Sequence, residues 1–482
     1  MNIVFFKLDL IKAINEYTDL INLYSTCSSL ASFKKYIYYK FNEEYSLMYY
    51  DDILFRNKIV NKISDTNKQL HLNFKFNENI RDVSVLSNLH SLKLLCCNNI
   101  IDVSPLRNLY YLDLAYCKNI EDVSALGNLY YLNLSYCSNI KNISSLGNVH
   151  TLSLSFCTCI TDTDVRALVN VHTLYLSGCI NITDVSVLGN VHTLYLNGCI
   201  NITNISALRN VHTLYLNDCT NITDISALKN VHNLNLKSCI YIRDVSALSN
   251  VHTLDLTKCI NITDVNALSN VHTLDLTNCI NITNVSALSN VHTLNLSYCI
   301  NIKDVSALGN VHTLILRGCK NITDVSALGN VHTLILCGCK NITGVSALSN
   351  VHTLDLSHCD CITDTDVRIL GNVHTLILNY CINITDVSAL GNVHSLFLRH
   401  CINITNINGL SNVHTLDLSY CDNITDVSAL CNVNSLFLRG CKNITNISAL
   451  SNVYTLDLTD CNITDLSVLG NIPNIILDNY DI

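Results

Sequence analysis

The sequence predicts an α/β solenoid of about 21 coils of 20–22 residues, in which each coil adds one short strand to a parallel, concave sheet. From about residue 69 to residue 482 the text repeats every 20 residues. Every repeat except the first and the last carries Leu-x-Leu, and the period of two in a strand places both leucines on one face. Residues 1–68 do not repeat, and their apolar residues have helical spacing. We therefore expect a small helical head at 1–68 and a solenoid at 69–482.

One repeat, residues 170–189, reads Asn-Val-His-Thr-Leu-Tyr-Leu-Ser-Gly-Cys-Ile-Asn-Ile-Thr-Asp-Val-Ser-Val-Leu-Gly. We expect its three leucines to point inward, Tyr175 to point outward, and Asp184 to cap a short helical turn. Gly189 and Asn190 are expected to form a left-handed turn into the next strand. Since an asparagine follows at that place in every connection, we predict a ladder of backbone-bonded asparagines there. The spacing is typical of leucine-rich repeats.

The composition excludes several other classes of protein. Hydrophobic residues make up 49% and charged residues only 14%, which is not typical of a disordered chain. A net charge of -9 argues against a basic nucleic-acid interface. No apolar run is long enough for a transmembrane helix, and the N-terminus lacks the features of a signal peptide. We therefore expect an intracellular, cytoplasmic protein that binds neither nucleic acid nor membrane, and that is a monomer by itself.

Cysteine occupies one repeat position in 19 coils, from Cys97 to Cys461, out of 25 cysteines in all. Equivalent positions in a solenoid share one environment, so no pairing pattern is implied. We expect reduced, buried thiols in an intracellular protein. The alternative is metal binding, for which Cys-x-Cys pairs such as Cys157 and Cys159 are candidates, although zinc sites usually need wider spacing. We predict no metal and no cofactor.

Histidine stands just before the strand in 15 coils, without a break from His150 to His414. Protonated rings one strand spacing apart would repel one another, so most should be neutral. We expect a stacked, half-exposed ladder with hydrogen bonds between coils. A pH sensor and a metal-binding ridge are the alternatives.

The outward strand position between the two leucines varies from coil to coil, which makes it the candidate surface for a partner. Aromatic and arginine side chains on a rigid sheet are typical anchors for a protein. Strand propensity alone is the alternative explanation for the aromatic residues. No distinct catalytic cluster is present, so we predict a protein that is not an enzyme. The candidate partner-binding residues are Tyr175, Tyr195, Tyr215, Ile315, Ile335, Arg317, Phe397, Arg399, Phe437 and Arg439.

The head contains Leu-x-x-x-Ile-x-x-Tyr-Thr-Asp-Leu-x-x-Leu-x-x-x-Cys-x-x-Leu from Leu10 to Leu30. This order resembles the F-box, a helical motif that docks on the Skp1-type adaptor of cullin ubiquitin ligases, with its core at 8–45. The resemblance implies an adaptor-binding face made of Leu10, Ile14, Leu20 and Leu23. The alternative is a helical cap that covers the first apolar end of the solenoid.

The repeats themselves also resemble known families. Cys-Ile-Asn-Ile-Thr-Asp at 179–184 resembles the cysteine-containing repeats of F-box substrate receptors, and Asp-Val-Ser-Ala-Leu-Gly-Asn resembles internalin-like repeats. The near-identical coils look like repeat proteins encoded by giant viruses of amoebae, which would imply host cytoplasm. These resemblances imply a protein–protein interaction scaffold that recognises substrates for a cullin-type ubiquitin ligase. A structural or decoy repeat protein with no ubiquitin link is the alternative.

Overall fold

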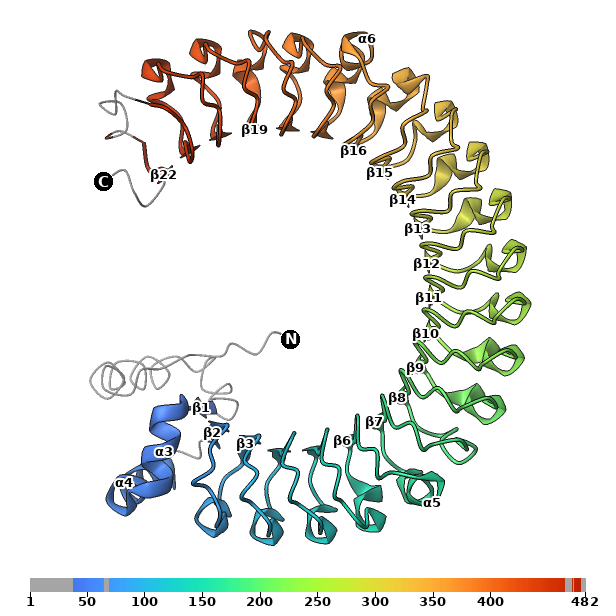
Figure 1. The fold of residues 1–482 in the computed structure, drawn as a ribbon, viewed down its shortest axis with the longest axis vertical. Helices are drawn as coiled ribbons and strands as arrows, with labels where there is room; N and C mark the ends of the chain where they lie inside the picture. The colour runs from blue at the N-terminus through green and yellow to red at the C-terminus, as the bar shows by residue number, and fades with distance from the viewer. Residues whose placement is uncertain (1–37, 65–68, 464–469, 471, 478–482) are drawn as a thin grey trace, which may run out of the picture. The chain divides into compact units, whose positions relative to one another are not determined.

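The computed structural model describes residues 38–64, 69–463, 470 and 472–477 of the 482-residue chain. Within them the chain forms two compact units, one that ends at residue 222 and one that begins at residue 223. In each unit, short parallel strands line one side of the coils and 3-10 turns line the other (Figure 1). The predicted leucine-rich repeat solenoid is thereby confirmed.

The first unit begins with β1 (Tyr38–Lys40), α3 (Glu43–Asp51) and α4 (Ile53–Ser64), and coils follow from residue 69. Its further strands are β2 (Gln69–Lys75), β3 (Ser91–Leu95), β4 (Tyr111–Asp113), β5 (Tyr131–Asn133), β6 (Thr151–Ser153), β7 (Thr173–Tyr175), β8 (Thr193–Tyr195) and β9 (Thr213–Tyr215). Its turns are η2 (Ser84–Leu86), η3 (Ser104–Leu106), η4 (Ser124–Leu126), η5 (Ser144–Asn148), α5 (Asp162–Val165), η6 (Arg166–Leu168) and η7 (Ser206–Asn210).

The second unit repeats the same alternation. Its strands are β10 (Asn233–Asn235), β11 (Thr253–Asp255), β12 (Thr273–Asp275), β13 (Thr293–Asn295), β14 (Thr313–Ile315), β15 (Thr333–Ile335), β16 (Thr353–Asp355), β17 (Thr375–Ile377), β18 (Ser395–Phe397), β19 (Thr415–Asp417), β20 (Ser435–Phe437), β21 (Thr455–Asp457) and β22 (Asn474–Ile476). Its turns are η8 (Ser226–Asn230), η9 (Ser246–Leu248), η10 (Asn266–Leu268), η11 (Ser286–Asn290), η12 (Ser306–Asn310), η13 (Ser326–Leu328), η14 (Val345–Asn350), α6 (Asp364–Val367), η15 (Leu370–Asn372), η16 (Ser388–Leu390), η17 (Leu410–Asn412), η18 (Ser428–Leu430) and η19 (Ser448–Leu450).

The core of each coil consists of the residues that the repeat keeps apolar. In the coil of β13, Leu294, Leu296, Cys299, Ile302 and Leu308 are fully buried. Neighbouring strands pair with leucine opposite leucine, so every coil places the same residues over the same residues of the coil before it. Burial of each leucine is worth about 1.5–3 kcal/mol relative to exposure, which makes this stacking the main source of stability.

The described part of the head packs on the first coil. Asn42 caps α3, because its side chain accepts a hydrogen bond from the Tyr45 backbone N–H at 2.9 Å. The Ser46 hydroxyl accepts one from the backbone N–H of Asn73 in β2 at 3.1 Å. The ring of Tyr50 lies edge-on to the buried Phe74, 6.2 Å between centroids. These contacts cover the apolar end of the solenoid.

One strand was not predicted, because it carries no repeat text. β1 pairs in parallel with β2, with Tyr38 opposite Gln69, inside the range assigned to the head. The F-box core at 8–45 lies mostly, and Leu10, Ile14, Leu20 and Leu23 lie entirely, outside the described residues. The predicted domain boundary at 68/69 therefore stays a prediction.

The left-handed turn lies at a different residue from the one predicted. It is the residue before the ladder cysteine that has a positive φ, as at Gly178 with +71° and Lys258 with +63°. Gly189 is not left-handed; a Cβ there would lie 2.4 Å from the carbonyl oxygen of Ala207 in the next coil. That glycine serves the close approach of two coils rather than a backbone reversal.

The asparagine ladder is also displaced from its predicted position. Asn190 is exposed, and the hydrogen-bonded ladder is formed by the asparagine two residues after the cysteine. Asn201 donates from Nδ2 to the carbonyl oxygen of Ile180 at 2.8 Å, and Asn301 does the same to Ile280 at 2.8 Å. At this position the carbonyl of the previous coil points at the amide, which the repeat text alone does not reveal.

The two 22-residue coils absorb their insertion on the turn side. Thr151 pairs with Thr173, so the strands stay in register while α5 takes up the extra residues. Asp162 of α5 then bonds to the next coil: Oδ1 accepts from the N–H groups of Thr183 at 2.7 Å and Asp184 at 3.0 Å, and Oδ2 from the Thr183 hydroxyl at 2.6 Å. Slight burial opposes ionisation, but these hydrogen bonds lower the pKa of Asp162.

We expect Asp162→Ala to lower the free energy of unfolding by about 1–2 kcal/mol at pH 7, because three acceptor contacts are lost. Since the pKa is lowered on folding, this stabilisation is present above pH ~4 and lost as the pH falls further. Urea titrations of both proteins at pH 7 and pH 3 measure it. Asp364 makes the same contacts to the coil of Thr385, so the change Asp364→Ala should give the same result and serves as an independent replicate. A cost that is equal at both pH values would contradict the assignment.

Candidate binding surfaces

The predicted tyrosines form one stack on the strand side of the first unit. Tyr175, Tyr195 and Tyr215 occupy equivalent positions in β7, β8 and β9, all half-buried. Their rings lie face to face, with centroids 4.2 and 4.3 Å apart. Burial, followed by the neighbouring hydroxyls, raises the pKa of Tyr195, so its own hydroxyl stays protonated at neutral pH. The rings therefore offer a strip of ordered edges and hydroxyl groups.

Ile315 and Ile335 lie side by side, since β14 and β15 pair them directly, and both are half-buried. Arg317 is exposed two residues further along the first of these strands. Its charge acts on the half-buried thiol of Cys337, whose pKa burial nevertheless raises. The structure thus brings these three predicted residues together as a small apolar patch with one cation.

Phe397 and Phe437 do not touch in the ladder, because Asp417 of β19 lies between them. Arg399 is held over the ring of Tyr420, with its guanidinium carbon 5.6 Å from the centroid. The guanidinium of Arg439 lies 3.5 Å from the Asp460 carboxylate. The predicted patch is therefore a mixed one, in which both arginines are already positioned by neighbouring side chains.

Sequence reasoning missed a second set of aromatic stacks, at the left-handed position before the cysteine. In the first unit Tyr116, Tyr136 and Phe156 stack at 4.2 and 4.6 Å. In the second unit His358, Tyr380, His400 and Tyr420 stack at 4.3, 4.5 and 4.4 Å. Both stacks end where the next coil has glycine, Gly178 and Gly440. The occurrence of aromatic residues and glycine at this one repeat position is the sequence signal from which these stacks could have been predicted.

The histidine rings are stacked as predicted, but from His172 to His414 the residues are exposed rather than half-exposed, and their hydrogen-bonding pattern differs. In the second unit the rings from His232 to His414 lie 4.5–4.7 Å apart. Nδ1 of His292 lies 3.2 Å from the hydroxyl of Thr293 in its own coil, so the ring does not bridge coils. In the first unit Tyr110 and Tyr130 continue the stack between His90 and His150.

The ladder thiols are buried, apart from the half-buried Cys461, and none of the described cysteines forms a disulfide. The thiol of Cys299 donates to the carbonyl oxygen of Leu276 in the previous coil at 3.1 Å. Burial raises the pKa of Cys299 and of Cys319 to about 12. The predicted burial of the ladder thiols is thus confirmed, with Cys461 as the half-buried exception.

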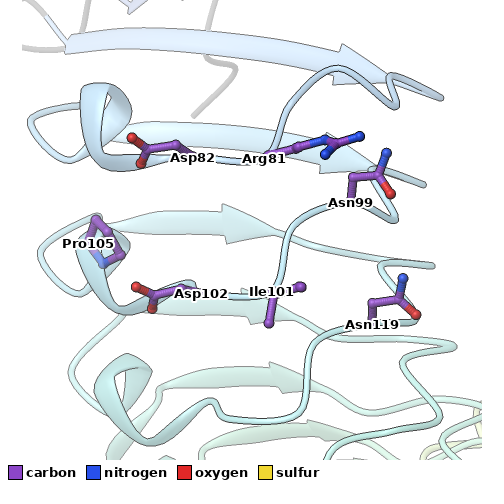
Figure 2. A pocket seen from close by; sticks show the side chains of 7 residues that line it. All are labelled: Arg81, Asp82, Asn99, Ile101, Asp102, Pro105 and Asn119. Atoms are coloured by element: carbon purple, nitrogen blue, oxygen red, sulfur yellow. The ribbon is translucent and has the colours of Figure 1, made fainter.

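A hollow of about 480 Å³ lies on the first unit where two coils meet (Figure 2). Figure 2 shows Asp82 and Asp102 at equivalent places in successive coils, with Arg81 and Ile101 before them. Each carboxylate accepts a hydrogen bond at 2.8 Å from the backbone N–H two residues later. Because these polar groups serve the coil itself, we assign no ligand to the hollow.

Across the described ranges, no group of three or more His, Cys, Asp or Glu side chains is arranged to hold a metal ion. No helix among the described residues has the length and apolar character needed to cross a bilayer.

The fold and its ladders define a leucine-rich repeat solenoid. Similar solved structures are an internalin of Listeria monocytogenes, InlF (24% identity, 66% of this chain, 82% of that chain, TM-score 0.33), and the functional domain of InlJ of the same species, which includes a cysteine ladder (20%, 81%, 73%, TM-score 0.40). A leucine-rich repeat protein of Leptospira interrogans is also similar (17%, 81%, 96%, TM-score 0.37). No family model and no curated protein matches the sequence.

Proposed function

We propose that the chain is a non-enzymatic scaffold whose strand side binds a protein partner. The observation that carries this proposal is the stack of Tyr175, Tyr195 and Tyr215. Tyrosine supplies a large amphipathic contact area at low entropic cost, and stacking orders these rings before a partner arrives. The mixed patch of Ile315, Arg317 and their neighbours in the second unit supports the same function.

We expect the variant with Tyr175, Tyr195 and Tyr215 changed to serine to bind its partner at least tenfold more weakly, since central aromatic anchors each contribute about 2 kcal/mol or more. Affinity purification with the wild-type chain identifies the partner, and titration with the purified partner measures the dissociation constant. Arg209→Ala, on η7 of the turn side, is the matched control and should bind normally. Equal affinity of all three proteins would contradict a binding site on this face.

For the head, we propose the F-box role: residues 8–45 dock on a Skp1-type adaptor, and the cullin's partner enzyme supplies the chemistry. Support comes from the segment that follows this range: in α4, Ile53 and Leu54 are 62% and 77% exposed, which gives the head an apolar surface suited to a partner. This role places the protein in the cytoplasm, the host's if the chain is viral as its repeats suggest. A structural or decoy protein is the competing function, favoured by the contacts through which α3 caps the first coil.

A pulldown of the full chain with purified Skp1-type adaptor and cullin separates the two functions. In the adaptor role the wild type binds, and Leu20→Asp with Leu23→Asp abolishes binding while the solenoid's circular dichroism and melting temperature are unchanged. In the capping role the wild type captures no adaptor, and the same double change lowers the melting temperature by exposing the core end.

A further inference from the structure

The histidine ladder of the second unit runs beside the hydrogen bonds that join its coils. The backbone N–H of His292 donates to the carbonyl oxygen of His272 at 3.1 Å, and that of His312 to His292 at 3.1 Å. Their rings stack at 4.7 and 4.6 Å. At each such junction, therefore, a ring pair and a coil-to-coil hydrogen bond belong to the same two residues.

The charged groups that act on these rings are the rings themselves. These residues are exposed, but the limited desolvation of the stacked rings, and then the charge of the imidazoles above and below, lower the pKa of His252, His292, His352 and His394. The groups beside Nδ1 are neutral threonine hydroxyls, at 3.2 Å for His252 and 3.3 Å for His352. A proton on one ring thus meets only repulsion from a proton on the next.

We propose that this ladder is an acid-sensitive clasp: at mildly acidic pH, charge on adjacent rings opens the coil-to-coil contacts between His232 and His414. Two unit charges at the ring spacing repel in water by an amount equal to about a fivefold change in an equilibrium constant, and a ring between two charged neighbours by about twentyfold. Because each coil contacts only its neighbours, the opening is local and follows the ladder.

The pH window follows from the direction of the pKa shifts. The pKa of His252, His292, His352 and His394 is lower in the folded chain than the value of about 6.5 in the unfolded chain, so their contribution makes stability fall as the pH drops below about 6.5. Asp244, Asp304 and Asp324 have pKa values below 3.8, held down by hydrogen bonds from the serine two residues later. These carboxylates therefore titrate at a lower pH than the histidines, and they do not cause the loss of stability expected below about pH 6.5.

The chain contains its own control coils. Asn434 and Tyr454 occupy the ladder position in the next two coils and keep the same backbone bonds, at 3.1 Å to His414 and 2.9 Å to Asn434. Asparagine is therefore compatible with the position. In a variant with His272→Asn, His312→Asn and His352→Asn, His292 and His332 have no histidine neighbour.

Hydrogen exchange of the full chain at pH 7.5 and 5.5, corrected for intrinsic rates, tests the clasp. We expect the amides of coils 272–352 to lose protection at least fivefold in the wild type and less than twofold in the variant, with the Asn434 and Tyr454 coils unchanged. Since 1 M salt shortens the screening length to about 3 Å, it should reduce the wild-type loss. Equal losses in both proteins, or an equal loss in the Asn434 coil, would overturn the proposal.

If the variant does not fold, NMR titration of the wild-type imidazole protons decides the question. The clasp requires midpoints below 6.5 that spread over more than one pH unit, because each protonation hinders the next. A common midpoint near 6.5 with simple one-proton curves would overturn it.

Discussion

Under native conditions, an alkylating reagent at pH 8 is expected to label the half-buried thiols of Cys96, Cys337 and Cys431 first and to leave the fully buried ladder thiols unlabelled. The thiolate is the reacting species. Burial raises the pKa of Cys299 from 9.0 to about 12, which lowers its thiolate fraction roughly a thousandfold before steric protection is counted. Intact-mass spectrometry against time, followed by peptide mapping, measures both classes.

The control for this experiment is the same chain in denaturant, in which all 25 cysteines should react. Cys337→Ser should remove one rapid label and leave the slow class unchanged. Rapid labelling of ladder cysteines such as Cys299 or Cys319 in the folded protein would mean that the coils do not stack as described. A missing thiol in the denatured sample would point to a disulfide, in conflict with the reduced ladder.

The period of the sequence predicted those features that depend on which residues are equivalent. It placed Leu174 inside and Tyr175 outside, and it placed Tyr195 and Tyr215 in the same row, because a strand alternates and each coil repeats the last. Burial of the cysteine ladder followed from the same argument. A repeated sequence shows directly which positions share one environment, because each coil gives the same comparison again.

Backbone conformation was not predictable in the same way. Gly178, Lys258 and Tyr298 occupy one repeat position, and all have a positive φ. Glycine usually marks a left-handed residue, but at this position most coils carry another residue type, so the sequence does not reveal the conformation. The direction of the asparagine amide depends on where the previous coil's carbonyl points, as at Asn201 and Ile180. β1 carries no repeat and pairs with β2 only through tertiary contact.

Gly178→Ala is expected to lower the free energy of unfolding by about 2–4 kcal/mol, whereas Gly198→Ala should cost only about 1 kcal/mol. Both glycines are left-handed, with φ of +71° and +68°, so the backbone cost of a Cβ is the same. At Gly198 the new methyl group meets nothing within 4 Å. At Gly178 it would lie 2.4 Å from the ring of Phe156, which must then leave its stack on Tyr136.

Urea titration of the two variants measures this difference, and the double variant Gly178→Ala with Phe156→Ala assigns its cause. If the ring is responsible, removing it should make the alanine at position 178 cost no more than the alanine at position 198, because only the left-handed backbone term remains. Phe156→Ala alone gives the value of the aromatic stack, expected at about 0.5–1.5 kcal/mol. Equal costs for Gly178→Ala and Gly198→Ala would show that Phe156 swings away freely, and that the aromatic stacks beside the cysteine ladder contribute little to the stability of the coils.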